Sequence, residues 1–333
     1  MTRSVVVTGA SAGVGRAVAR AYAARGARVA LIARGAAGLA AAERDCHERG
    51  ATDVRTYQVD VADAGAVQQA ADDVVHHWDG LDVWVNNAMV SVFAPAWEIP
   101  AVEFRRVTEV NYLGTVHGTL AALRHMRAHG RGAIVQVGSA LAYRGIPLQS
   151  AYCATKHAVQ GFNDSLRAEL LHDCPGVRLS MVQLPAINTP QFSWVRTRLP
   201  RHPQPVPPIF APELAARAVL WAADHGTREL NVGGPTWRAR LGDMLVPGLL
   251  DRKLARDGYD SQQTETPVDP AAWRDNLDRP RDDEADRGAD GIFTDRARTR
   301  SAALWVGTHK PVLSGAALAA LALALAGVTR HRR

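Results

Sequence analysis

The stretch "SVVVTGASAGVG", residues 4–15, runs from a β-branched apolar segment through a glycine-rich loop into a helix-forming segment. Gly9 permits a tight turn, Gly13 lets the backbone approach a bound group closely, and Gly15 allows close packing of the helix. The unpaired N–H groups and the positive dipole end at the start of such a helix attract phosphate. The loop, which includes Ser11, is therefore predicted to hold the pyrophosphate of a dinucleotide. A glycine-rich turn without a ligand is the alternative.

The rest of the first 235 residues alternates short apolar runs with Ala-rich amphipathic stretches. Seven runs are predicted as strands, over residues 4–9, 28–34, 54–60, 81–88, 132–139, 177–184 and 228–234. Helices are expected over residues 14–25, 36–49, 64–78, 101–129, 150–173 and 212–225. Because the strands are apolar throughout, they are expected to be covered on both faces, as in a parallel sheet. The alternation predicts a doubly wound α/β sheet of seven strands.

The composition excludes several classes of protein. The net charge is +6 and the pI is near 9.6, yet the basic residues are scattered, so nucleic-acid binding is not expected. The three cysteines, Cys46, Cys153 and Cys174, form no CxxC pair, which argues against a disulfide scaffold and favours a reducing compartment. The first residues enter a strand without the apolar region of a signal peptide, so a cytoplasmic location is expected.

The end of the second predicted strand bears on the choice of dinucleotide. A fold that prefers NAD places an acidic residue there, against the ribose 2′-hydroxyl. This strand ends "LIARG", with Arg34 and no carboxylate nearby. An arginine at that point can pair with a 2′-phosphate through charge-assisted hydrogen bonds, so NADP(H) is predicted over NAD(H). A solvated arginine at a strand end is the alternative.

Further motifs follow in order: Asp60 after the third strand, "NNA" at 86–88, Asn111 in "EVNYLGT", Ser139 after the fifth strand, and Tyr152 with Lys156. Together with the glycine loop, this set resembles the short-chain dehydrogenase/reductase family over about the first 235 residues. The resemblance implies a single Rossmann domain that transfers a hydride between NAD(P) and a carbonyl or alcohol. The implied catalytic group is Asn111, Ser139, Tyr152 and Lys156. With Arg34 from the second strand, the expected cofactor contacts are Gly9, Ser11, Gly13, Gly15, Arg34, Asp60, Asn86, Ala88, Tyr152, Lys156, Ile187 and Thr189.

Three features depart from the family pattern. Met89 follows "NNA" where the family usually carries glycine, so a thioether lies at the approach to the nicotinamide or on the floor of an apolar pocket. The proline-glycine pair after the sixth strand is missing, and "LPAINTP", residues 184–190, aligns only with Leu184 and Pro185 in its place. The chain also continues beyond residue 235, where the family core ends.

The chain is expected to divide into a nucleotide-binding catalytic domain (1–235), a polar extension that is partly helical or disordered (236–310), and an apolar helix with a basic end (311–333). Residues 237–257 are predicted as a helix interrupted at Pro247, and residues 198–212 as a proline-rich substrate loop. The uncharged stretch 312–328 is about 25 Å long as a helix, against about 30 Å of hydrocarbon in a bilayer. Peripheral membrane contact through this stretch is expected, with a full span as the alternative.

Tyr152 and Lys156 form the predicted centre of the chemistry. Only three of the 39 lysines and arginines are lysines, so a lysine four residues after Tyr152, on the same helix face, is informative. Free tyrosine has a pKa of about 10, and a nearby ammonium is expected to lower it. In carbonyl reduction Tyr152 would donate a proton, and Ser139 would hydrogen-bond the same oxygen. By resemblance, Asn111 would help to hold a water that relays protons to Lys156.

Three alternatives to this chemistry exist. A nucleophilic Ser139 would lack the GxSxG elbow and a partner His and acid. His125 and His129 lie one helical turn apart but lack an HExxH glutamate, so no metal is expected. A module that binds NADP without turning over a substrate is the remaining alternative to an enzyme.

The substrate is expected to be a bulky, apolar carbonyl or alcohol, such as a lipid, steroid or polyketide-like compound. The candidate pocket walls are Met89, Leu141, Ile146, Phe192, Trp194 and Phe210. By resemblance to the family, the chain is expected to form a homodimer or homotetramer.

Overall fold

The computed structural model describes residues 2–309, and the expected apolar helix over 311–333 lies outside them. Seven strands form one parallel sheet in the order β10-β7-β6-β4-β1-β2-β3. They are β1 (Ser4–Thr8), β2 (Arg28–Ala33), β3 (Asp53–Gln58), β4 (Val83–Asn86), β6 (Gly132–Ser139), β7 (Val177–Leu184) and β10 (Glu229–Asn231). The strand order changes direction between β1 and β4, which confirms the predicted doubly wound α/β fold.

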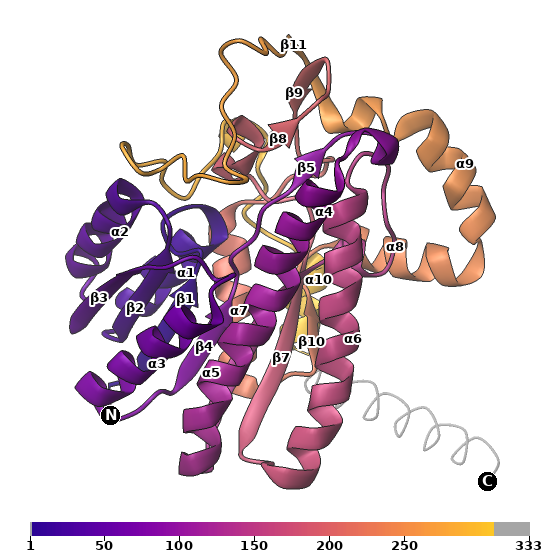
Figure 1. Cartoon of the computed structure of the whole chain (residues 1–333). Helices are drawn as coiled ribbons and strands as arrows, with labels where there is room; N and C mark the ends of the chain where they lie inside the picture. The colour runs from indigo at the N-terminus through magenta and orange to yellow at the C-terminus, as the bar shows by residue number, and fades with distance from the viewer. Residues whose placement is uncertain (1, 310–333) are drawn as a thin grey trace, which may run out of the picture.

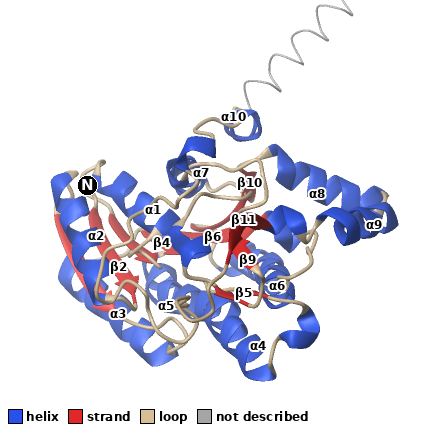
Figure 2. Cartoon of the chain, turned by 90° about the horizontal axis from the view of Figure 1, so that it is seen from above, coloured by secondary structure: helices blue, strands red, loops and turns tan. Residues whose placement is uncertain are grey.

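Helices cover both faces of the sheet (Figures 1 and 2). The main helices are α1 (Gly13–Ala23), α2 (Ala36–Glu48), α3 (Ala64–Trp78), α4 (Ala101–Thr108), α5 (Gly114–His129), α6 (Ser150–Asp173) and α7 (Pro212–His225). Val5 and Val7 of β1 pack in the core that includes α1, α2 and α7, whereas Val6 packs in the core that includes α3, α5 and α6. Successive strand side chains thus point to opposite faces, and both faces are buried, as expected for a parallel sheet.

One predicted helix contains a π-helical turn. Residues 101–129 form a continuous helical run, as expected, in which α4 passes through a π-helical turn over Glu109–Leu113 into α5. Two contacts hold this turn: the side chain of Asn111 bonds the backbone of Val90, and the hydroxyl of Thr115 donates to the Asn111 carbonyl at 2.7 Å. π-Helical turns are frequent at functional sites.

Short elements lie outside the main sheet and its helices. Two small sheets pair β5 (Val92–Phe93) with β8 (Arg196–Thr197), and β9 (Arg201–Pro203) with β11 (Gln263–Pro267). The remaining single turns of 3₁₀ helix are Ala96–Glu98, Ala140–Ala142, Pro190–Ser193, Asp260–Gln262 and Thr294–Arg296. Because β11 belongs to the extension and β9 to the proline-rich connection 198–212, these two segments fold together.

The extension wraps around the carboxyl ends of the strands. It contains α8 (Gly234–Leu245), α9 (Pro247–Asp257) and α10 (Ala302–Thr308), and Pro247 starts α9, which confirms the predicted interruption. Between β11 and α10 the chain has little regular structure, but Leu277 is fully buried in the core cluster that also includes α3, α5 and α6. No helix within residues 2–309 has the length and apolar character needed to cross a membrane.

Candidate active site

A cavity of about 460 Å³ lies at the carboxyl ends of β1, β2, β4, β6 and β7, where ligands bind in open α/β sheets. Its walls come from the glycine loop, the ends of the strands, α6 and the extension. Of the predicted site residues, those that line it are Gly9, Ser11, Gly13, Arg34, Asp60, Ala88, Ser139, Tyr152, Lys156, Ile187 and Thr189. The fold therefore brings most of the sequence-predicted site together in one cavity.

The glycine loop is shaped by close approach of the backbone. Gly9 has φ 65°, and a Cβ at this position would lie 2.8 Å from the Cα of Ala88. A Cβ on Gly15 would lie only 2.1 Å from the Gly9 carbonyl oxygen, so Gly15 serves packing behind the cavity wall. Gly13 lines the cavity at the first turn of α1, which has no side-chain cap of its own. The Gly13 N–H of this turn donates to the Gly288 carbonyl of the extension at 3.1 Å, so a phosphate would be bound by the N–H groups that follow Gly13 in the turn.

The "NNA" motif places its two asparagines in different surroundings. Asn86 does not line the cavity, because its amide bonds Thr119 at 3.0 Å and Gln136 at 2.9 Å in a buried network. Its predicted contact with the cofactor is therefore corrected to a structural role. Asn87 lines the cavity instead, and its amide donates to the carbonyl of Thr8 at 3.0 Å, which holds the end of β1 against the end of β4.

Tyr152 and Lys156 lie one turn apart on α6, and burial is the main cause of the pKa shift of each. The Lys156 Nζ donates to the Val137 carbonyl at 2.8 Å and lies 5.6 Å from the centroid of the Tyr152 ring. Burial raises the pKa of Tyr152 to about 12, an effect that the neighbouring Ser139 opposes. Burial also lowers the pKa of Lys156 to about 8. The expectation that Lys156 lowers the Tyr152 pKa is therefore wrong for this state, since desolvation sets the direction of the shift and the opposing effect comes from Ser139.

Ser139 lies at the cavity surface near this pair, whereas Asn111 lies behind it. Ser139 lines the cavity, and its Oγ accepts a hydrogen bond from the Leu141 N–H at 3.1 Å. Asn111 is buried behind the cavity wall: its Oδ1 accepts from the Val90 N–H at 2.8 Å, and its Nδ2 donates to the Val90 carbonyl and to Thr155. Asn111 thus ties the loop after β4 to α6, and its predicted part in a proton relay stays a prediction.

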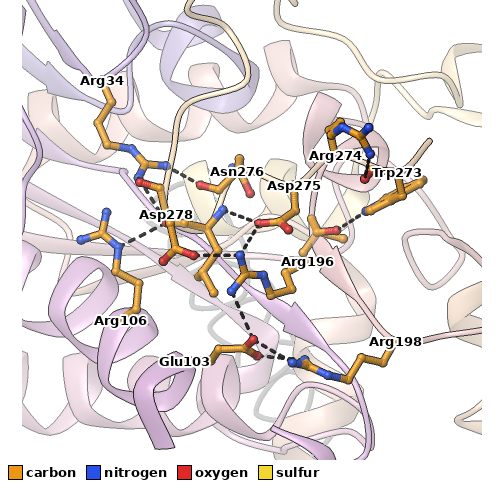
Figure 3. Close-up of polar contacts among 12 residues, drawn as sticks. Arg34, Glu103, Arg106, Arg196, Arg198, Trp273, Arg274, Asp275, Asn276 and Asp278 are labelled. Carbon is orange, nitrogen blue, oxygen red and sulfur yellow. Dashed lines mark hydrogen bonds and ion pairs between the residues drawn. The ribbon is translucent and has the colours of Figure 1, made fainter. Parts of the chain in front are cut away.

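Arg34 lies at the cavity wall, but its guanidinium is held by the extension (Figure 3). It donates to the backbone carbonyls of Asn276, Leu277 and Asp278, with distances of 3.2 Å and 3.3 Å to the last two. The carboxylate of Asp60 lies 3.9 Å from it. The guanidinium thus contacts backbone oxygens at the place where the sequence predicted a phosphate partner.

The extension contributes cavity residues that the sequence-based reasoning missed. Asn276, Pro280, Arg281 and Asp282 line the cavity together with residues of the first 235. The available signal was Leu277, an apolar residue between Asn276 and Asp278 within a strongly polar stretch. No periodicity surrounds it, because this part of the chain forms neither helix nor strand.

The expected apolar walls are largely in place. Met89, Leu141, Ile146, Phe192 and Trp194 line the cavity, in agreement with the expectation. Phe210 does not: its carbonyl accepts from the Asn188 N–H at 2.8 Å, and its side chain is buried in the core with α7. The assignment of Phe210 to the pocket is therefore corrected to a core position.

The two histidines on α5 have ordinary surface partners. The Nε2 of His125 lies 2.7 Å from a carboxylate oxygen of Asp72, and the Nδ1 of His129 lies 2.8 Å from the His125 carbonyl oxygen. Within residues 2–309, His, Cys, Asp and Glu form no cluster of three that could hold a metal ion.

Residues 3–199 match the family model described as short chain dehydrogenase. The chain belongs to the short-chain dehydrogenase/reductase family. An uncharacterised oxidoreductase of Bacillus subtilis, YxnA, is 31% identical over 320 residues, which cover 95% of this chain and 88% of that relative. A D-threitol dehydrogenase of Mycolicibacterium smegmatis is 36% identical over 230 residues, which cover 66% of this chain and 85% of the relative.

A solved structure of the same family shows the fold independently. The alcohol dehydrogenase of the archaeon Thermococcus sibiricus, complexed with 5-hydroxy-NADP, matches with a TM-score of 0.61 and 29% identity, over 69% of this chain and 96% of that chain. The match with the Bacillus subtilis protein includes most of the extension, since it spans 95% of this chain. This short-chain dehydrogenase/reductase is therefore similar to at least one relative beyond the catalytic domain.

Proposed function

We propose that this short-chain dehydrogenase/reductase transfers a hydride between a nicotinamide dinucleotide and a bulky, apolar carbonyl or alcohol. The observation that carries the proposal is the meeting of Tyr152, Ser139 and Lys156 in one cavity that continues to the glycine loop. The apolar walls, among them Leu141 and Phe192, support the substrate class.

The cavity has the features that a dinucleotide requires. Gly9 and Gly13 both have positive φ, at 65° and 59°, which disfavours a side chain at either position, and a Cβ at Gly9 would also lie 2.8 Å from the Ala88 Cα. In the proposed complex Gly9, Ser11 and Gly13 hold the pyrophosphate, Lys156 contacts the nicotinamide ribose, and Ile187 and Thr189 contact the carboxamide. When bound, the nicotinamide accepts or supplies the hydride.

Tyr152 is the proposed general acid and base. With its pKa raised by burial to about 12, its phenol is protonated near neutrality and is ready to donate to a carbonyl oxygen in the reduction direction. Ser139 holds the same oxygen, and the ammonium of Lys156 stabilises the phenolate that remains. Alcohol oxidation needs the phenolate first, so its rate is expected to rise with pH through the alkaline range.

The sequence predicts NADP(H) over NAD(H) from Arg34, and this preference stays a prediction. In its favour, Arg34 lies at the cavity wall. Against it, three backbone carbonyls of the extension already accept hydrogen bonds from the guanidinium. The proposed hydride transfer is the same with either dinucleotide.

The remaining expectations concern assembly and location. A homodimer or homotetramer and a cytoplasmic location stay predictions. Membrane contact through 312–328 lies outside the described residues and also stays a prediction.

Consumption of NADH and NADPH with a panel of hydrophobic ketones tests the proposal. Tyr152→Phe should lower the rate about a hundredfold or more, because general acid catalysis typically contributes 10²–10⁴-fold. Tyr57→Phe is the matched control, since the Tyr57 hydroxyl bonds Asp73 away from the cavity. If wild type and Tyr152→Phe are equally inert while both bind a reduced dinucleotide, the chain is the non-catalytic binding module and the proposal is wrong.

A further inference from the structure

We propose that Asp282, a residue of the C-terminal extension, selects the cofactor: its carboxylate receives the adenosine ribose 2′-hydroxyl and rejects a 2′-phosphate, so that NAD(H) is preferred. The inference rests on the proposed use of a nicotinamide dinucleotide. It departs from the prediction of NADP(H) that Arg34 suggested.

The position of Asp282 is that of the acid which NAD-preferring folds carry at the end of their second strand. Here β2 ends at Ala33, and Arg34 and Gly35 follow it without a carboxylate. The Oδ1 of Asp282 lies 2.0 Å from where a Cβ on Gly35 would stand. The carboxylate therefore fills the space of a side chain at residue 35, about 20 residues after the glycine loop, where the ribose-binding acid is found.

The start of α2 offers no free donor to a phosphate. Its N-cap residue is Gly35, which has no side chain to cap the helix. The N–H groups of the first turn donate to the extension instead. The Ala36 N–H donates to the Asp283 carboxylate at 3.1 Å, and the Ala37 N–H donates to the Asp283 carbonyl at 3.2 Å. The Gly38 N–H donates to the Asp282 carbonyl at 2.8 Å. A 2′-phosphate would need such donors, and it would have to displace the extension to obtain them.

The carboxylate of Asp282 is itself poised for a ligand. Asp282 is only 6% exposed and lines the cavity, yet no donor within residues 2–309 hydrogen-bonds its Oδ1 or Oδ2. Because the carboxylate lines the cavity and accepts no hydrogen bond from the described protein, a ribose hydroxyl could donate to it without displacing a protein partner. A phosphate in the same place would instead bring a second anion against the first.

Arg281 is the group that competes with this assignment. It lines the cavity next to Asp282 and is the cation that would attract a 2′-phosphate. Arg34, in contrast, donates to the carbonyls of the extension (Figure 3). The assignment to Asp282 follows from its position at Gly35 and from the filled donors of α2.

Direct binding of NADH and NADPH to the full-length chain tests the inference. Reduced-cofactor fluorescence or calorimetry is measured in the Tyr152→Phe background, so that turnover does not contribute. We expect NADH to bind about tenfold or more tightly than NADPH, and Asp282→Asn to reduce this ratio about tenfold, chiefly by improving NADPH. Asp278→Asn is the matched control, because its carboxylate pairs with Arg196 and does not line the cavity.

Two results would overturn the inference alone. One is a wild-type preference for NADPH that Arg281→Gln abolishes; the other is an unchanged ratio in both Asp282→Asn and Asp282→Ser. Unaltered thermal unfolding of these variants shows that the extension still docks. Binding of neither dinucleotide to wild type would overturn the proposed function together with this inference.

Discussion

Lys156 is a buried cation whose position costs stability. Its Nζ is enclosed beside Tyr152 and donates to one backbone carbonyl, that of Val137, at 2.8 Å. Burial lowers its pKa to about 8, because the charged form loses hydration that a single carbonyl does not replace. Active sites commonly hold such unfavourable groups in return for reactivity. The proposed chemistry at Tyr152 therefore gives a reason for the lysine that stability does not.

Lys156→Met should raise the free energy of unfolding at pH 7 by up to about 3 kcal/mol while abolishing activity. The sign follows from linkage. Between pH 8 and pH 10.5 the unfolded chain binds more protons at Lys156 than the folded chain, so stability rises with pH in wild type. The advantage of the variant should thus be greatest below pH 8 and vanish near pH 11.

Urea unfolding at pH 7 and pH 10.5 checks this prediction. Lys253→Met is the control, since Lys253 is exposed and pairs with Asp257 on the surface of α9. A variant at Lys156 that is destabilised equally at both pH values would contradict a desolvation cost.

At the scale of elements, the extension is docked by arginines from the catalytic domain and by one apolar anchor. Arg196 of β8 pairs with Asp275 at 3.1 Å and Asp278 at 2.8 Å, and it also bonds Glu103 of α4 (Figure 3). Leu277, between these acids, is fully buried. Because the ion pairs are partly exposed and contribute modestly, burial of Leu277 is the larger stabilising term.

Leu277→Ala should release the segment around residues 275–288 while leaving the sheet folded. Truncation of a buried leucine to alanine typically costs about 2–5 kcal/mol, and here this loss destabilises the docking of the extension. The partly exposed ion pairs contribute only about 0–1 kcal/mol each, so they do not compensate. Hydrogen exchange should therefore accelerate at the Ala37 and Gly38 amides, which donate to the extension. Affinity for NADH should fall in parallel.

The matched control for this variant is Leu171→Ala on α6, where the side chain is 69% exposed. Unchanged exchange at Ala37 and Gly38 in Leu277→Ala would show that polar contacts alone hold the extension. Faster exchange throughout β1 and β4 would show that Leu277 supports the whole domain instead.

At the scale of the whole molecule, one parallel sheet presents its carboxyl ends to a cavity, and residues of the extension form part of the wall of that cavity. The groove of the nucleotide-binding fold thereby becomes a more enclosed site, with Gly288 accepting a hydrogen bond from Gly13 at 3.1 Å. Arg16, 1% exposed, joins the loop, α2 and the extension through Ser11, Gly38 and Asp286. The extension is thus part of the site.

The stretch 312–328 is predicted to bring the molecule to a membrane surface. We expect the full chain to sediment with vesicles that contain anionic lipid, and a chain that ends at Thr308 to stay in the supernatant, because apolar area and basic residues both favour interfacial binding. Both proteins should turn over substrate equally without vesicles. Equal sedimentation of the two would remove this role from residues 309–333.

The fold of the first 235 residues can be predicted from local sequence patterns. The glycines of residues 8–15, the apolar strands and the Tyr152–Lys156 spacing each act over a few residues, so their pattern predicts the sheet, the cavity and most of its walls. The sequence-based assignment of Asn86 and Phe210 to the site was wrong. Residues at the ends of strands can point into the cavity or into the core, and packing across the sheet places both of these in the interior.

What the sequence determined alone was the doubly wound fold and the identity of the residues at the ends of its strands. Tertiary structure alone decided the pKa of Tyr152, since charge spacing is visible along a helix but exclusion of water is not. It also decided the surroundings of Arg34, because the contact with residues 276–278 joins segments more than 240 residues apart. Such a contact depends on burial of Leu277 and on backbone carbonyls that every sequence possesses, and no local pattern encodes either of them.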